Sequence, residues 1–61
     1  MTELLSLREG SKELKLSIHT LRAWTYQKRI PFVRLGRRVL LRREDLEDLV
    51  KKNVIEAKEE A

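Results

Sequence analysis

The sequence predicts one small domain that is mainly α-helical and carries a β-hairpin. A serine precedes each of two short helical patterns, at Ser6 and Ser17, where its hydroxyl can cap a helix. Pro31 then interrupts helical structure and is followed by short alternating apolar segments around Gly36. A third helical pattern begins near Glu44. A chain of 61 residues has room for a single thin core, because a fold of this size buries only about 60% of its unfolded surface.

The first predicted helix runs from Leu7 to about Leu14. Ser6 and Glu9 have the spacing of a capping box, in which the serine hydroxyl accepts from the third helical N–H and the glutamate reaches back. At about 100° per residue, four positions share one face: Leu7, Gly10, Ser11 and Leu14. The two small residues in the middle of this face allow another helix to approach closely.

A second helix is predicted to start directly after Ser17. Leu16 and Leu21 are placed as a hydrophobic staple across that N-cap. Because only about three residues separate the two helices, they must turn sharply against each other, which is the helix-turn-helix arrangement. The inward face is predicted to hold Ile18, Leu21, Trp24 and Thr25. The opposite, polar arc holds His19, Arg22, Ala23, Tyr26 and Gln27.

Pro31 is predicted to end helical structure, and the segment after it reads as a hairpin. A three-residue loop, Gly36 to Arg38, would place four apolar side chains on one face: Val33, Leu35, Val39 and Leu41. A two-residue loop would pair Leu35 with Arg38 and split that set. The sequence therefore favours the three-residue loop. It leaves on the other face Phe32, Arg34, Leu40 and Arg42.

A third helix is predicted from near Glu44 to about Asn53. The carboxylates of Glu44 and Asp45 suit the positive end of the helix dipole. Its stripe follows Leu46, Leu49, Val50, Asn53 and Ala57, and weakens after Val50. Residues 1–53 are expected to form the domain, and residues 54–61 an acidic helical extension or a frayed tail, with fraying expected at Lys58 to Ala61.

Charge is distributed unevenly along the chain. From Arg22 to Arg43 there are eight Lys or Arg residues and no Asp or Glu. Residues 1–43 carry eleven basic and three acidic residues (+8) and residues 44–61 carry three and seven (−4), which together give the net charge of +4. Basic residues interleaved with apolar ones indicate a folded cationic surface whose expected partner is a polyanion, above all DNA.

Composition argues against several other functions. The chain has no Cys and a single His, so neither a thiolate nor a multi-histidine metal site is expected, and no cofactor is implied. It also lacks a glycine-rich phosphate loop and any Ser/His/Asp arrangement in plausible order, so we expect no enzymatic activity. The apolar runs are too short for a membrane span or a signal peptide, which favours a cytoplasmic protein.

The polar arc of the second helix has the character of a surface that reads a DNA major groove. Arg22 can address guanine and Gln27 adenine, while Ala23 is small enough to meet a thymine methyl. The alternative is a merely solvated helix face. Trp24 is expected to be a core residue rather than a base-stacking one, because it lies three residues after the inward Leu21.

The hairpin offers a second DNA contact. Arg37 and Arg38 at its tip are placed to grip phosphates or to enter a minor groove, the alternative being an exposed turn whose charges only aid solubility. Flanking charge is expected from Lys28, Arg29, Arg34, Arg42 and Arg43. The first four could contact phosphates, although Arg34 and Arg42 could instead cover the outer sheet face with their stems. The predicted DNA-binding set is Ser17, His19, Thr20, Arg22, Ala23, Tyr26, Gln27, Lys28, Arg29, Arg34, Arg37 and Arg38.

Several segments together resemble a known family. They are Leu14-Lys15-Leu16-Ser17, Leu21, Trp24, Ile30-Pro31, Val33-Arg34-Leu35-Gly36-Arg37-Arg38-Val39 and Asp45-Leu46. Over about residues 4–51 the chain resembles the small winged helix-turn-helix DNA-binding domains of the excisionase and MerR-like group. The resemblance implies that the second helix enters the major groove, with Ser17 to Gln27 as the recognition segment, and that the hairpin is the wing.

Two residues depart from the pattern of that family. Lys15 and Lys28 stand where the family usually has glycine. If the backbone is left-handed there, each lysine costs around 1 kcal/mol relative to glycine. The two lysines could instead alter the turn or add cationic contacts.

The sequence thus predicts binding to specific double-stranded DNA sites, either in transcription regulation or as an excisionase-type factor that directs DNA recombination. Useful specificity would then need a dimer or a cooperative array, with a recombinase or RNA polymerase as a further partner. A rival is a protein-interaction module whose basic wing docks an acidic partner. RNA binding is a second rival, disfavoured because exposed stacking aromatics are scarce.

Overall fold

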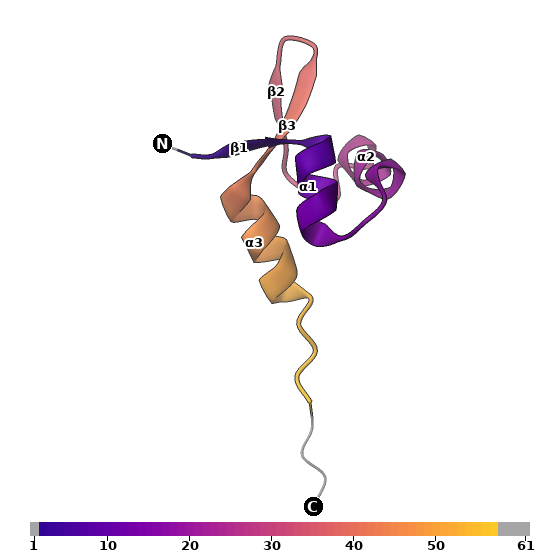
Figure 1. Ribbon diagram of the computed structural model, residues 1–61, viewed down its shortest axis with the longest axis vertical. Coiled ribbons are helices and arrows are strands. Elements are labelled where there is room, and N and C mark those ends of the chain that lie inside the picture. The colour runs from indigo at the N-terminus through magenta and orange to yellow at the C-terminus, as the bar shows by residue number, and fades with distance from the viewer. Residues whose placement is uncertain (1, 58–61) are drawn as a thin grey trace, which may run out of the picture.

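The computed structural model describes residues 2–57, which form three helices and a three-stranded antiparallel sheet (Figure 1). In chain order the elements are β1 (Leu4–Ser6), α1 (Leu7–Leu14), α2 (Ile18–Tyr26), β2 (Val33–Leu35), β3 (Arg38–Arg42) and α3 (Arg43–Lys52). Helix α1 packs against α2 and against the sheet, while the β2–β3 hairpin and α3 extend toward opposite ends of the molecule. This is a winged helix-turn-helix fold, as predicted.

Both predicted N-caps are confirmed. At α1 the Ser6 hydroxyl accepts from the Glu9 N–H at 3.1 Å, and the Glu9 carboxylate accepts from the Ser6 N–H at 2.8 Å. The Ser17 hydroxyl accepts from the His19 N–H at 3.1 Å and caps α2. These bonds satisfy N–H groups that have no partner inside the helix, and they fix where each helix begins.

A lysine with left-handed backbone follows each of the helices α1 and α2. Lys15 and Lys28 each have a φ of 56°. The following N–H groups reach back five residues, from Leu16 to the Ser11 carbonyl at 3.0 Å and from Arg29 to the Trp24 carbonyl at 2.9 Å. This is the Schellman pattern, which turns the chain sharply away from a helix. Helix α2 ends at Tyr26, with Gln27 as its C-cap, and Lys28 turns the chain. Pro31, which was predicted to end helical structure, lies in the loop that follows.

The three-residue hairpin loop predicted from the sequence is wrong. Leu35 pairs with Arg38 and Val33 with Leu40, so the loop is the two residues Gly36 and Arg37. Gly36, with a φ of 61°, occupies the first central position, where a type II′ turn favours glycine. Two apolar residues of the predicted single face, Val33 and Leu35, therefore lie on the outer face of the sheet with Leu40, away from the helices.

A third strand, which the sequence did not predict, explains this register. Strand β1 pairs with the free edge of β3, and Leu5 lies opposite Leu41. Both side chains are buried, at 4% and 0% exposure, so this pair fixes the core-facing side of β3. Val39 lies on the same core-facing side of β3, and its cross-strand partner Arg34 therefore lies on that side of the sheet too. The prediction that places Arg34 on the face opposite Val39 is also wrong.

The core lies where the sheet meets the three helices. Its buried apolar residues are Leu5, Leu21, Ile30, Leu41 and Leu46. Around them pack the partly buried Leu7, Leu14, Trp24, Phe32 and Leu49. Gly10 permits this close approach, because a Cβ there would meet Leu41 Cδ1 at 2.8 Å and Leu21 Cδ2 at 3.3 Å. Trp24 points inward as predicted but is only half-buried.

Helix α3 begins at Arg43, one residue before the predicted start, and ends at Lys52. Residues 54–57 form no helix or strand, and Val54 and Ile55 are 56% and 93% exposed. The fraying predicted for Lys58 to Ala61 concerns residues outside those described. The described helices are too short and too polar to span a bilayer.

Candidate nucleic-acid interface

Helix α2 presents two different rows of side chains. His19, Ala23 and Gln27 are spaced four residues apart and continue along the side opposite the buried Leu21. Arg22 and Tyr26 lie on the flank between that outward row and the core, beside the buried Thr25. The polar arc predicted for this helix is therefore confirmed as its exposed side, and it is divided into an outward row and a flank.

The flank of α2 faces the wing across a cleft of about 360 Å³. The lining residues are Leu7, Arg22, Thr25, Tyr26, Phe32, Arg34, Gly36, Arg37 and Val39. On the hairpin these are alternate positions of each strand, as expected for one face of a sheet. Four of the predicted DNA-binding residues thus come together here, namely Arg22, Tyr26, Arg34 and Arg37.

The two arginines predicted at the wing tip lie on different faces of the hairpin. Arg37 is in the loop and lines the cleft, whereas Arg38 is the first residue of β3 and pairs with Leu35 on the outer face. Arg38 is close enough to Glu9 to help lower the pKa of that carboxyl, although the Ser6 backbone N–H is the larger cause. The tip therefore carries charge toward both faces of the sheet.

The other predicted contact residues surround this surface. Ser17 uses its hydroxyl as the helix cap, and Thr20 and Ala23 are half-buried. Lys28 and Arg29 are exposed just beyond α2, and the Arg29 guanidinium lies over the Trp24 ring at 5.4 Å from its centroid. That cation–π contact and the packing of Trp24 on the core support its structural role.

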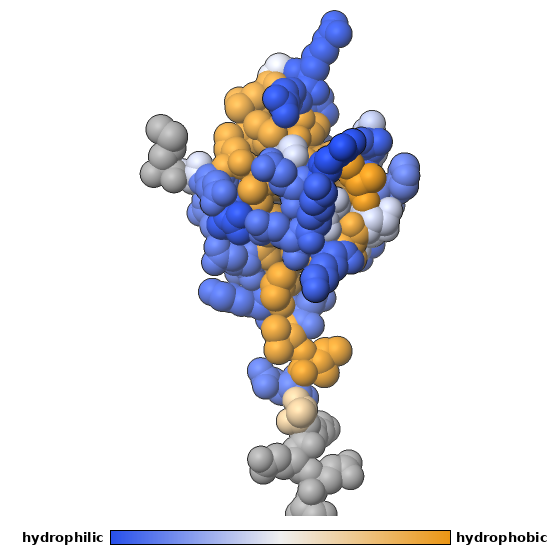
Figure 2. Space-filling view, viewed as in Figure 1, coloured by the Kyte–Doolittle hydropathy of each residue, from blue (hydrophilic) through white to orange (hydrophobic). Residues whose placement is uncertain are grey.

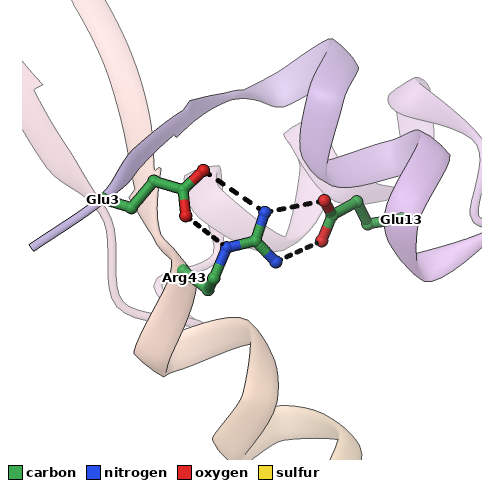
Figure 3. A network of polar contacts seen from close by, with 3 residues as sticks. All are labelled: Glu3, Glu13 and Arg43. Atoms are coloured by element: carbon green, nitrogen blue, oxygen red, sulfur yellow. Dashed lines mark hydrogen bonds and ion pairs between the residues drawn. The ribbon is translucent and has the colours of Figure 1, made fainter.

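The last two arginines of the acid-free stretch are held by carboxylates. Arg42 donates to both oxygens of Asp45 at 2.6 and 2.8 Å. Arg43 lies between Glu3 and Glu13 and donates to both (Figure 3), with bonds of 2.6 Å to Glu3 and 2.7 Å to Glu13. The contact with Glu13 is the main cause that raises the pKa of the Arg43 guanidinium. The prediction that Arg42 and Arg43 provide flanking charge is therefore corrected, because both join parts of the fold.

The remaining basic residues of the stretch are available for a partner. The exposed members that form no ion pair within residues 2–57 are Arg22, Lys28, Arg29, Arg34, Arg37 and Arg38. An exposed cation that forms no ion pair keeps most of its attraction for an external anion, although the Glu9 carboxylate offsets part of that of Arg38. The charge that a partner meets is thus concentrated on the wing and on the end and flank of α2.

Sequence reasoning missed two parts of this surface. The apolar floor of the cleft, formed by Leu7, Phe32 and Val39, was not recognised because it depends on the hairpin register. The outer sheet face also exposes Leu4 and Leu35, at 41% and 54%. Apolar residues gather over the hairpin in Figure 2. The glycine of the two-residue turn was the signal in the sequence that could have revealed both.

The comparison with protein families agrees with this architecture. A family described as a helix-turn-helix domain matches residues 4–54, which include every described helix and strand. No curated protein and no solved structure gives a significant match. Helix-turn-helix domains place their second helix in the major groove, so the family suggests DNA as the partner. The chain belongs to the excisionase-like helix-turn-helix domain family.

Proposed function

We propose that this protein binds specific sites in double-stranded DNA without catalysing a reaction. Arginines that form no ion pair among the described residues gather on the wing and on the flank of α2, beside the outward polar row of that helix, and this grouping supports DNA binding most strongly. A helix that reads base edges needs neighbouring cations to hold the duplex in register. In this chain Arg22 lies on the flank of α2 next to the outward row, and Arg34 and Arg37 line the same cleft as Arg22.

The outward row of α2 would read the major groove. His19 and Gln27 can form hydrogen bonds with base edges, and Ala23 between them lets the helix approach and can contact a thymine methyl. Lys28 and Arg29 at the end of α2 would contact the backbone, and Arg37 and Arg38 would extend the wing along the same duplex. All these side chains except Ala23 are exposed.

Two biological roles use this same chemistry. One is transcription regulation, in which the bound domain recruits or blocks RNA polymerase, and the other is an excisionase-type role that directs a recombinase. One module of this size offers few base contacts, so a second copy or a cooperative array on repeated sites would supply useful specificity.

A protein-interaction module is the second candidate. The outer sheet face favours it, because the exposed Leu35 lies beside Arg38 and could contact an acidic protein. Such a function would use the outer face of the wing and would leave the outward row of α2 without a partner.

Selection of bound duplexes from a random pool separates these candidates. A DNA reader should enrich one short motif, and the spacing of repeated motifs would report how copies assemble. The same pool tested with an Arg37→Ala, Arg38→Ala variant is the control for retention through charge alone. Failure to enrich any sequence would remove sequence-specific reading, and failure to retain any duplex would favour the protein partner.

A further inference from the structure

Three arginines from separate parts of the chain line one cleft, and we propose that they jointly hold a single phosphate of the DNA backbone. Arg22 comes from α2, Arg34 from β2 and Arg37 from the hairpin turn. The inference rests on the proposed function, since it names the ligand of this cleft within a DNA complex.

The three arginines are the principal hydrogen-bond donors of the cleft. Leu7, Phe32 and Val39 are apolar, and the Thr25 hydroxyl already donates to the Arg22 carbonyl at 2.7 Å. The remaining side-chain donor is the Tyr26 hydroxyl, on a residue that is 79% exposed. An apolar floor beneath guanidinium groups excludes water from one side and strengthens their attraction for an anion.

Within residues 2–57, the arginines of the cleft have no carboxylate partner. None of the three arginines forms an ion pair within the described part of the chain, whereas Arg42 forms one and Arg43 forms two. Like charges around one small space repel each other, and a bound anion removes that repulsion. The planar guanidinium fork matches the oxygen pairs of a phosphate, which makes a phosphodiester a suitable ligand.

A backbone phosphate fits this position better than a protein carboxylate. The cleft opens beside the outward row of α2, whose side chains are polar or small, at His19, Ala23 and Gln27. A protein partner at that place would need apolar surface to bury, and the exposed apolar residues of the wing lie on its other face.

The proposal changes the role of Arg22. On the sequence alone Arg22 is the candidate for reading guanine, but its place on the flank beside Arg34 and Arg37 makes it a phosphate contact. It would raise affinity for every duplex and fix the helix in register, while His19, Ala23 and Gln27 read the bases.

Neutral phosphate analogues test this directly. In a duplex that carries the selected site, each phosphate in turn is replaced by an uncharged methylphosphonate, and binding is measured for the unaltered protein and for single alanine variants. One replacement should weaken the unaltered protein about tenfold, as expected for loss of charge-assisted hydrogen bonds. At that same position Arg22→Ala, Arg34→Ala and Arg37→Ala should each lose less than about twofold more, because their shared contact is already weakened.

Arg38→Ala is the matched control, since Arg38 is next to Arg37 but on the outer face. It should keep the full sensitivity at that phosphate. Thermal melts of all variants confirm that each is folded.

Two results would overturn the inference. If Arg22→Ala stays fully sensitive at every phosphate and instead loses discrimination of one base pair, Arg22 reads a base, and DNA binding itself stands. If the unaltered protein binds no duplex, the proposed function fails together with the phosphate site.

Discussion

Lys15 and Lys28 adopt a left-handed backbone conformation that disfavours any residue with a β-carbon. A β-carbon crowds the neighbouring carbonyl at a φ of 56°, so glycine would be favoured at both positions. The family pattern pointed to both positions in the sequence, and of the alternatives left open there the structure has the left-handed backbone at both lysines.

Lys15→Gly should raise the free energy of unfolding by about 1 kcal/mol, because it removes left-handed strain. Lys12→Gly is the matched control: it changes the same residue type inside α1, where glycine should lower stability by about 1 kcal/mol. Urea denaturation measures both variants. Equal destabilisation by the two substitutions would show that Lys15 is not strained.

Gly10→Ala should destabilise the protein by about 1–2 kcal/mol, although alanine is the better helix former. The added methyl would stand 2.8 Å from Leu41 Cδ1, and Leu41 is fully buried and has little room to move. The gain in helix propensity, about 1 kcal/mol, offsets only part of that cost. Thermal melts measure the change in stability. An increase in the melting temperature would mean that Gly10 packs less closely against Leu41 than described.

At the scale of elements, the three helices could be predicted from the sequence. Of the three-stranded sheet, only the hairpin of β2 and β3 could be predicted, and its register could not. Ser6, Ser17 and their neighbours specify helix starts through local hydrogen bonds, which sequence spacing reveals. Strand β1 has only three residues and runs directly into the Ser6 cap, so it leaves no alternating pattern to detect. The hairpin register follows from the long-range pair of Leu5 with Leu41, which is why a local argument about apolar pairs chose the wrong loop.

The hairpin register also determines on which face of the sheet each arginine of the candidate site lies. The two wing arginines are adjacent in sequence and were predicted to act together, but the two-residue loop directs them to different faces. The outward row of α2 could be predicted, because helical periodicity is local. The cleft could not, since it forms only when β2 and α2 meet.

The wing and the reading row should respond differently to substitution. Arg37→Ala with Arg38→Ala should weaken all duplexes similarly and lower the steepness of the salt dependence by about 2, since two cations are lost. Gln27→Ala should lose about 1–3 kcal/mol on the preferred site and little on unrelated duplexes. Binding to the selected and to a scrambled duplex at several salt concentrations separates the two effects. A wing variant with unchanged affinity for the scrambled duplex would contradict this assignment.

At the scale of the whole molecule, Arg43 joins segments that are far apart in sequence. It stands at the start of α3 and binds Glu3, just before β1, and Glu13 of α1, 40 and 30 residues away (Figure 3). Sequence reading assigned Arg43 to the DNA-facing charge, because the acids that hold it lie outside the acid-free stretch. The folded chain thus uses part of its positive charge for its own stability.

This arrangement predicts a loss of stability in acid. The Arg43 hydrogen bonds lower the pKa of Glu13 below its ordinary value of 4.5, and the Ser6 backbone N–H lowers the pKa of Glu9. A carboxyl whose pKa is lower in the folded state stabilises the fold above the unfolded pKa and ceases to do so as the pH falls through the folded pKa. Stability should therefore decline as the pH falls below about 4.5.

Urea midpoints measured across that range test the acid prediction. Glu13→Gln cannot be protonated at this position, so its stability should fall less steeply with acid than that of the unaltered protein. Identical pH profiles for the two proteins would mean that the Glu13–Arg43 contact does not stabilise the fold.

We propose that the basic residues on the wing and beside α2, which form no ion pair within residues 2–57, bind the backbone of double-stranded DNA. Titration of a labelled duplex at increasing salt concentration tests it most directly. Contacts with about five phosphates predict that the logarithm of the association constant falls with the logarithm of salt concentration at a slope near −4 to −5. Absence of duplex binding at low salt, or an affinity that does not change with salt, would contradict the account.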